Sequence, residues 1–144
     1  TCRRVPKNKV FNVIAGYTVL NDVTIRDWQL ATPTMTMGKS WDSHCPMGPV
    51  LVTADEVGPL GKLRVCTEVN GELRQDALVR DLIFDVPTLI RTLSEVVTLM
   101  PGDIIATGTP AGVGIGFDPP RFLKTGDLVG ITIDRLGKLE NPVA

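Results

Sequence analysis

Residues 63–76 read Leu-Arg-Val-Cys-Thr-Glu-Val-Asn-Gly-Glu-Leu-Arg-Gln-Asp, and this stretch is the clearest indication of how the chain folds. Two strand-like runs, residues 63–69 and 72–76, flank Asn70-Gly71. Both turn residues accept the positive φ that a type I′ turn requires, so an Asn-Gly pair between such runs is a strong hairpin signal. The stretch therefore predicts an antiparallel β-hairpin.

Short apolar runs on both sides of this hairpin predict further strands. They are expected over residues 13–20, 49–53, 103–107 and 128–136, with a last turn at Gly137-Lys138. One helix is expected to open at Asp85, with Pro87 near its first position, and to end before Pro101-Gly102. Its apolar residues recur at helical spacing: Leu89, Ile90, Leu93, Val96 and Val97. We therefore expect one domain over residues 1–144, mainly β with few helices, in the α+β class.

The composition excludes several classes of protein. With 43% hydrophobic residues and a net charge of −1, the chain is not a disordered tail, and it exerts no general attraction on nucleic acid or an anionic membrane. The apolar runs are too short to span a bilayer. The three cysteines are odd in number and show no C-x-x-C spacing, which favours a reducing compartment. A cytoplasmic location is expected, or a mitochondrial one if the source is eukaryotic.

Three segments carry side chains suited to chemistry. In the first, Asp22, Arg26 and Gln29 would share one face if a short helix began near Asn21. They would then place a carboxylate, a guanidinium and an amide beside an apolar strand. The alternative is an ordinary capped helix with an exposed Asp22–Arg26 ion pair and a solvated Gln29.

The other two segments are Gly38-Lys39-Ser40 and the glycine-rich loop from Gly108 to Gly116. Lys39 could bind an anionic substrate, or it could be a surface lysine, and no P-loop motif precedes it. The loop does not fit G-x-G-x-x-G, which disfavours a dinucleotide. Its glycines would still let the backbone approach a ligand, with Thr109 offering a hydroxyl, unless the loop is only a flexible connector. The single histidine, His44, has neighbours in sequence that point away from it, which disfavours a Ser-His-Asp hydrolase.

Five stretches in order resemble the C-terminal catalytic domain of the fumarylacetoacetate hydrolase family. They are GYTVLNDVTIRDWQ (16–29), GKSWDSHCPMGP (38–49), VNGELRQ (69–75), MPGDIIATGTPAGVG (100–114) and FLKTGDLV (122–129). The resemblance implies a mixed β-sandwich roll, a homodimer, and a divalent metal ion, Mg²⁺ or Mn²⁺ with Ca²⁺ as an alternative. By motif position it makes Asp22 a metal ligand and assigns the substrate's oxo-acid group to Arg26, Gln29, Lys39 and Thr109, with Arg26 and Lys39 catalytic.

The implied activity is a metal-dependent reaction of a small 2-oxo or 1,3-dicarbonyl acid through an enolate. C–C bond hydrolysis of an acylpyruvate-type substrate is the leading expectation. The alternatives are isomerisation or decarboxylation of hydroxymuconate-type dioates or oxaloacetate, and a non-catalytic truncated member. Neither a nucleic acid nor a membrane is an expected partner.

The sequence departs from the family pattern in its carboxylates. The family's other two metal ligands come from an E-x-E motif upstream of the stretch that matches Gly16, and its general base also lies upstream. This chain contains no E-x-E, and residues 1–15 include no Asp or Glu. A single carboxylate should bind Mg²⁺ poorly, because Mg²⁺ gives up water only for several well-placed oxygens. We therefore expect a catalytic domain that is incomplete at its N-terminal side.

Overall fold

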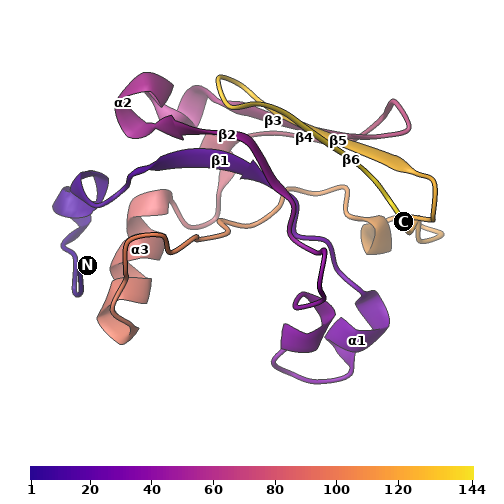
Figure 1. Cartoon of the computed structure of the whole chain (residues 1–144), viewed down its shortest axis with the longest axis horizontal. Coiled ribbons are helices and arrows are strands. Elements are labelled where there is room, and N and C mark those ends of the chain that lie inside the picture. Colours follow the sequence, from indigo (N-terminus) through magenta and orange to yellow (C-terminus); the bar gives the residue numbers. More distant parts are fainter.

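The computed structural model describes residues 1–144 and contains two antiparallel sheets with few helices, as expected for the α+β class (Figure 1). β1 pairs with β2, and the larger sheet has the order β4-β3-β5-β6. The strands are β1 (Gly16–Leu20), β2 (Met47–Thr53), β3 (Arg64–Val69), β4 (Glu72–Leu78), β5 (Leu128–Ile133) and β6 (Gly137–Pro142). The α-helices are α1 (Arg26–Leu30), α2 (Ala54–Val57) and α3 (Val86–Val96). Short 3-10 helices cover Lys7–Asn12, Thr36–Gly38, Leu60–Lys62, Val79–Asp81 and Gly114–Gly116.

The predicted hairpin is present as β3 and β4. Val69 pairs with Glu72, and the turn residues Asn70 and Gly71 have φ values of 53° and 79°. Both values are positive, as the Asn-Gly signal requires. β3 also pairs with β5 along its other edge, so β3 is an inner strand of the larger sheet and β4 is an edge strand.

Several of the predicted strands have different bounds. Two are longer than predicted, since β2 begins at Met47 rather than at residue 49 and β4 ends at Leu78 rather than at residue 76. The first predicted strand begins at Gly16 rather than at residue 13, because Lys7–Asn12 forms a 3-10 helix. The run 128–136 is broken after Ile133, where Asp134, Arg135 and Leu136 form the turn and Arg135 has a φ of 65°. Gly137, expected in the turn, is already the first residue of β6.

Residues 103–107 are not a strand, so that prediction is wrong. Asp103 N–H instead donates to the Met100 carbonyl oxygen at 3.1 Å, and the run pairs with no neighbouring strand. Its apolar character has another cause, because Ile105 packs against the apolar cluster of Val5, Val10 and Ile90. Ile104 is exposed, so a short apolar run shows neither that all of its residues are buried nor that the backbone is a strand.

The expected helix is α3, and both of its ends have identifiable causes. Asp85 Oδ1 accepts the Thr88 N–H at 2.8 Å and caps the first turn. The helix ends at Val96, before Pro101, because Leu99 pairs with Cys2 in an isolated antiparallel bridge with two hydrogen bonds of 2.9 Å. None of the helices has the length and apolar character that crossing a membrane requires.

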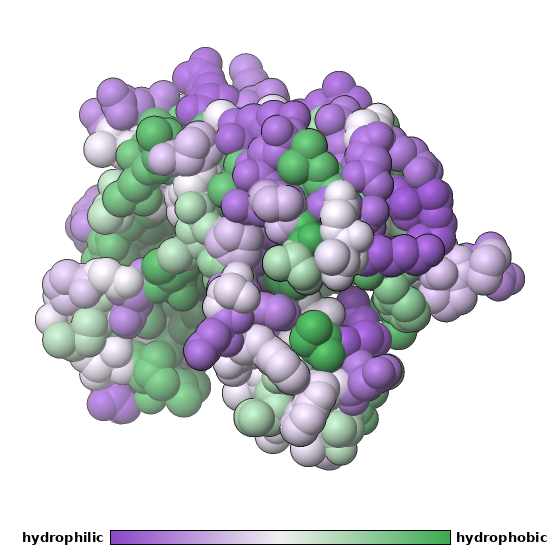
Figure 2. Space-filling view, turned by 45° about the vertical axis from the view of Figure 1, so that its right-hand side comes forward, coloured by the Kyte–Doolittle hydropathy of each residue, from purple (hydrophilic) through white to green (hydrophobic).

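The main core lies between the two sheets and brings β1 against β5 and β6. Its buried members are Val19, Val57, Leu63, Val129, Ile131, Leu136 and Leu139. Val19 is fully buried, which fixes the end of β1 from which the candidate site departs. Outside this core many large apolar side chains remain at the surface, where Figure 2 shows them as patches between polar ones on one face.

Candidate functional site

The segment between β1 and β2, residues 21–46, carries four of the five predicted site residues and projects away from the sheets (Figure 1). Its base is closed by a hydrogen bond from Asn21 N–H to the Pro46 carbonyl oxygen at 3.0 Å. Ile25 N–H donates to the Gly38 carbonyl oxygen at 2.8 Å. A Cβ at Gly38 would lie 2.5 Å from the Gln29 backbone, so only glycine permits this approach. These contacts bring two separate motifs together.

Lys39 forms an ion pair with Asp22 and therefore is not a free surface lysine. Its Nζ also donates to Thr24 Oγ1 at 3.3 Å, while the Thr24 hydroxyl donates to the Asp22 carbonyl oxygen at 3.1 Å. Both charged side chains remain partly exposed, 36% for Lys39 and 44% for Asp22. Solvent and a small ligand can therefore reach the pair.

Arg26 and Gln29 form the second polar pair of this segment. Arg26 Nη1 donates to Gln29 Oε1, and Gln29 is buried rather than solvated. The Arg26 Nε atom is also buried and has no hydrogen-bond partner. This guanidinium therefore has donor capacity that no other residue of the chain uses.

The predicted helix face with Asp22, Arg26 and Gln29 is wrong, and so is the alternative Asp22–Arg26 ion pair. α1 begins only at Arg26, because Ile25 is extended at φ −82° and ψ 103° and is held by its bond to Gly38. Asp22 thus precedes the helix and pairs with a residue 17 positions away. Arg26 and Gln29 remain neighbours one turn apart, as the spacing predicts.

Thr109 lies in the glycine-rich loop and makes no hydrogen bond to the other four residues. Its hydroxyl accepts from Gln75 Nε2, on β4, at 2.8 Å. The loop is therefore anchored to the larger sheet and is not a free connector. In Figure 1 it belongs to the orange segment that passes below this sheet.

The carboxylates of this chain do not complete a metal site. No group of three or more His, Cys, Asp or Glu side chains is placed to hold a metal ion. Asp22 is a single carboxylate, and its partner in the structure is the Lys39 ammonium group. The donor set of residues 1–144 therefore does not fit a divalent cation by itself.

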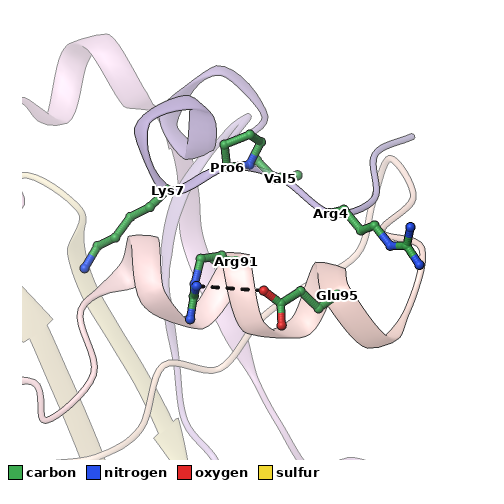
Figure 3. Close-up of a pocket in the computed structure, with 6 residues that line it drawn as sticks. All are labelled: Arg4, Val5, Pro6, Lys7, Arg91 and Glu95. Atoms are coloured by element: carbon green, nitrogen blue, oxygen red, sulfur yellow. Dashed lines mark ion pairs between the residues drawn. The ribbon is translucent and has the colours of Figure 1, made fainter.

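A hollow of about 700 Å³ lies elsewhere, between the N-terminal segment and α3 (Figure 3). It is lined by Arg4, Val5, Pro6, Lys7, Arg91 and Glu95. Arg91 pairs with Glu95 at 3.8 Å, and Lys7 pairs with Asp85 at 3.1 Å, so two of its three cations are neutralised. It contains none of the predicted site residues, and no function is assigned to it.

The sequence reasoning missed the polar cluster beside the glycine-rich loop. Glu72 accepts two hydrogen bonds from Arg121, at 2.7 and 2.6 Å, and these bonds lower the pKa of Glu72. The guanidinium carbons of Arg74 and Arg121 lie over the Phe117 ring, at 5.3 and 5.2 Å from its centroid. These residues come together only because the loop packs against β4. No local sequence pattern predicts that contact.

The fumarylacetoacetate (FAA) hydrolase C-terminal family matches residues 1–144. The chain belongs to the fumarylacetoacetate hydrolase family. The resemblance carried by the five motifs is thereby confirmed, and the fold of the family's solved members confirms the expected fold. The fumarylacetoacetate hydrolase of psychrophilic Exiguobacterium antarcticum superposes with a TM-score of 0.91 at 42% identity, over 98% of this chain and 50% of that one.

Relatives within the family carry different activities. The oxaloacetate tautomerase YisK of Bacillus subtilis is 51% identical over 97% of this chain and 46% of its own length. The maleylpyruvate hydrolase of Sphingobium sp. SYK-6, solved with manganese(II) and pyruvate, has a TM-score of 0.86 at 41% identity, over 100% of this chain and 49% of that one. The chain thus spans about half the length of the relatives it matches. Hydrolase, isomerase and tautomerase names all occur among them.

Proposed function

We propose that this chain carries the oxo-acid-binding residues of an enzyme that acts on small 2-oxo or 1,3-dicarbonyl acids through an enolate. The observation that carries the proposal is the hydrogen bond between Ile25 and Gly38, which brings the segments that contain Arg26 and Lys39 side by side. Each of these cations directly follows a partner in the Ile25–Gly38 hydrogen bond. Two positive side chains are thereby held on one small segment, where a dicarbonyl acid presents its negative charge.

The side chains have distinct roles in this proposal. Arg26 offers a planar pair of donors to a carboxylate, and Lys39 offers a compact positive charge to the keto oxygen. Gln29 orients Arg26, and Thr109 adds a hydroxyl from the loop. When a general base takes a proton from the carbon next to the keto group, the electron pair of the broken C–H bond moves onto the keto oxygen, and a preorganised cation stabilises that charge.

Asp22 is proposed as one ligand of a divalent cation, Mg²⁺ or Mn²⁺ with Ca²⁺ as an alternative. Support comes from the relative that holds manganese(II) and pyruvate, since pyruvate is itself a 2-oxo acid. The remaining ligands would have to come from outside residues 1–144. When bound, such an ion polarises a carbonyl as a Lewis acid.

Tautomerisation of a 2-oxo dicarboxylic acid is the leading reaction. The 51% identity with an oxaloacetate tautomerase favours it over the C–C hydrolysis that heads the expectations from sequence. Hydrolysis of an acylpyruvate-type substrate is the second candidate, favoured by the hydrolases at 41% and 42% identity. Both reactions pass through an enolate and use the same cations.

The test is the variant Lys39→Met in the full protein, assayed both for enol–keto conversion of oxaloacetate and for cleavage of an acylpyruvate. Losing one donor to a developing oxyanion typically costs about 10²- to 10³-fold in rate, so kcat should fall by about that factor on whichever substrate is turned over. Lys62→Met, which removes an exposed lysine on the 3-10 helix Leu60–Lys62, should leave kcat unchanged. A Lys39→Met enzyme with wild-type kcat would refute the proposal.

A further inference from the structure

The motif Val-Asn-Gly-Glu-Leu-Arg-Gln contains a residue that the hairpin does not explain. Its last member, Gln75, lies on β4 and is half-buried. The Gln75 Nε2 atom donates to Thr109 Oγ1 at 2.8 Å and to the Pro110 carbonyl oxygen at 2.9 Å. One side-chain amide thus holds two consecutive residues of the glycine-rich loop.

The direction of these bonds follows from the partners. A carbonyl oxygen can only accept, so the atom of Gln75 that faces Pro110 must be the NH₂ group. That group has two hydrogens, one for each of its two acceptors. The Thr109 hydroxyl is therefore an acceptor toward Gln75. Its own hydrogen stays free to donate, and Thr109 is exposed.

The loop backbone is fixed next to the same strand. Gly112 has a φ of 107°, and a Cβ there would lie 1.9 Å from the Arg74 carbonyl oxygen, so no other residue fits without moving the strand or the loop. Between Ile104 and Gly112 no residue takes part in a backbone–backbone hydrogen bond. The Gln75 amide therefore provides the directional contacts that hold Thr109.

We infer that Gln75 is a positioning residue, which orients the Thr109 hydroxyl as a hydrogen-bond donor toward the carboxylate of the bound oxo acid. The inference rests on the proposed function, because that function makes Thr109 a substrate-binding residue. Gln75 itself does not touch the substrate. A side chain at position 75 that can only accept hydrogen bonds would reverse the direction of its bond to Thr109. It would accept the hydroxyl hydrogen of Thr109, which could then not be donated to the ligand.

The experiment compares Gln75→Leu, Gln75→Glu and Thr109→Val in the full protein, with Thr109→Ser as the conservative control. The Kd for pyruvate is measured by calorimetry. Loop order is measured separately, as the rate at which thermolysin cuts before the apolar residues of 104–115. Losing one ligand hydrogen bond should raise the Kd about tenfold in the first three variants and leave Thr109→Ser close to wild type.

Three further results are expected. Gln75→Glu should raise the Kd at least as much as Gln75→Leu, although glutamate keeps the shape of glutamine. The double variant Gln75→Leu/Thr109→Val should bind pyruvate no more weakly than Thr109→Val alone, because Gln75 acts through Thr109. Thermolysin should cut the loop faster in Gln75→Leu and Gln75→Glu than in the wild type.

The outcomes separate this inference from the proposed function. If Thr109→Val raises the Kd while both Gln75 variants match the wild type in Kd, the inference is overturned whatever the cleavage rate, and the proposed function stands. If Thr109→Val leaves the Kd unchanged, the substrate role of Thr109 fails, and the role of Gln75 in binding fails with it. Gln75→Glu keeps the test decisive should Gln75→Leu not fold.

Discussion

Asp22 shows at the scale of one residue what spacing can and cannot reveal. The sequence singles out Asp22, Arg26, Gln29 and Lys39, and all four lie in one segment of the structure. The partner of Asp22 could not be predicted, because the i, i+4 argument assumes a helix and α1 begins only at Arg26. The contact with Lys39 spans 17 positions and depends on the Ile25–Gly38 bond, which no local pattern encodes.

The proposed role of Asp22 predicts a loss of metal affinity in Asp22→Asn. Asparagine keeps the shape and one oxygen but removes the charge that a hard cation prefers. Because even outer-shell changes cost about 10- to 100-fold in metal affinity, we expect at least about 100-fold weaker Mn²⁺ binding, measured by calorimetry on the full protein. Asp42→Asn, an exposed neighbour in the same segment, is the matched control. Equal affinities for the two variants would remove Asp22 from the ligand set.

At the scale of elements, the sequence predicts what is local. The β3–β4 hairpin follows from Asn70-Gly71, and the start of α3 follows from Asp85 and Pro87. The predictions fail where contacts between distant segments determine the structure. Residues 103–107 contact the core through Ile105 but pair with no strand, and α3 ends at Val96 because Leu99 pairs with Cys2. Periodicity reports which residues are apolar, but it does not report which partner covers them.

The joint between α3 and the N-terminal segment depends on Ser94, which is fully buried. Its hydroxyl accepts the Val5 N–H at 3.0 Å and donates to the Arg91 carbonyl oxygen at 3.0 Å. Ser94→Ala would leave the buried Val5 N–H without a partner, at a cost of about 1–3 kcal/mol in the free energy of unfolding. Urea denaturation of the full protein measures this cost.

Thr92→Ala is the control for that measurement, because Thr92 is exposed on the same helix. It should be neutral or slightly stabilising, since alanine has the higher helix propensity. Equal midpoints for Ser94→Ala and Thr92→Ala would show that the Ser94 hydroxyl does not secure the joint.

The whole molecule exposes more surface than its mass predicts. Its accessible area is 9543 Å², whereas a compact monomer of 15.6 kDa exposes about 7,200 Å². Only 15 of 144 residues are buried, and Ile83, Val96 and Leu51 are 93%, 75% and 64% exposed. The excess of roughly 2,300 Å² is larger than the area of about 800 Å² that one partner buries in a standard-size protein interface. Composition could not show this, because it counts apolar residues without placing them.

These apolar faces predict that the 144-residue chain alone binds more of the dye ANS than the full protein does at equal molar concentration. The chain alone is also expected to self-associate in sedimentation velocity.

In the full protein, we expect further chain and a second copy to cover these apolar faces. Ile83→Glu should then weaken assembly, because it forces a charge into an apolar contact. Lys62→Glu changes an exposed charge instead and should leave the sedimentation coefficient unchanged. If Ile83→Glu sediments like the wild type, Ile83 lies outside any interface; if the isolated chain is monomeric and binds little ANS, the exposed faces need no partner.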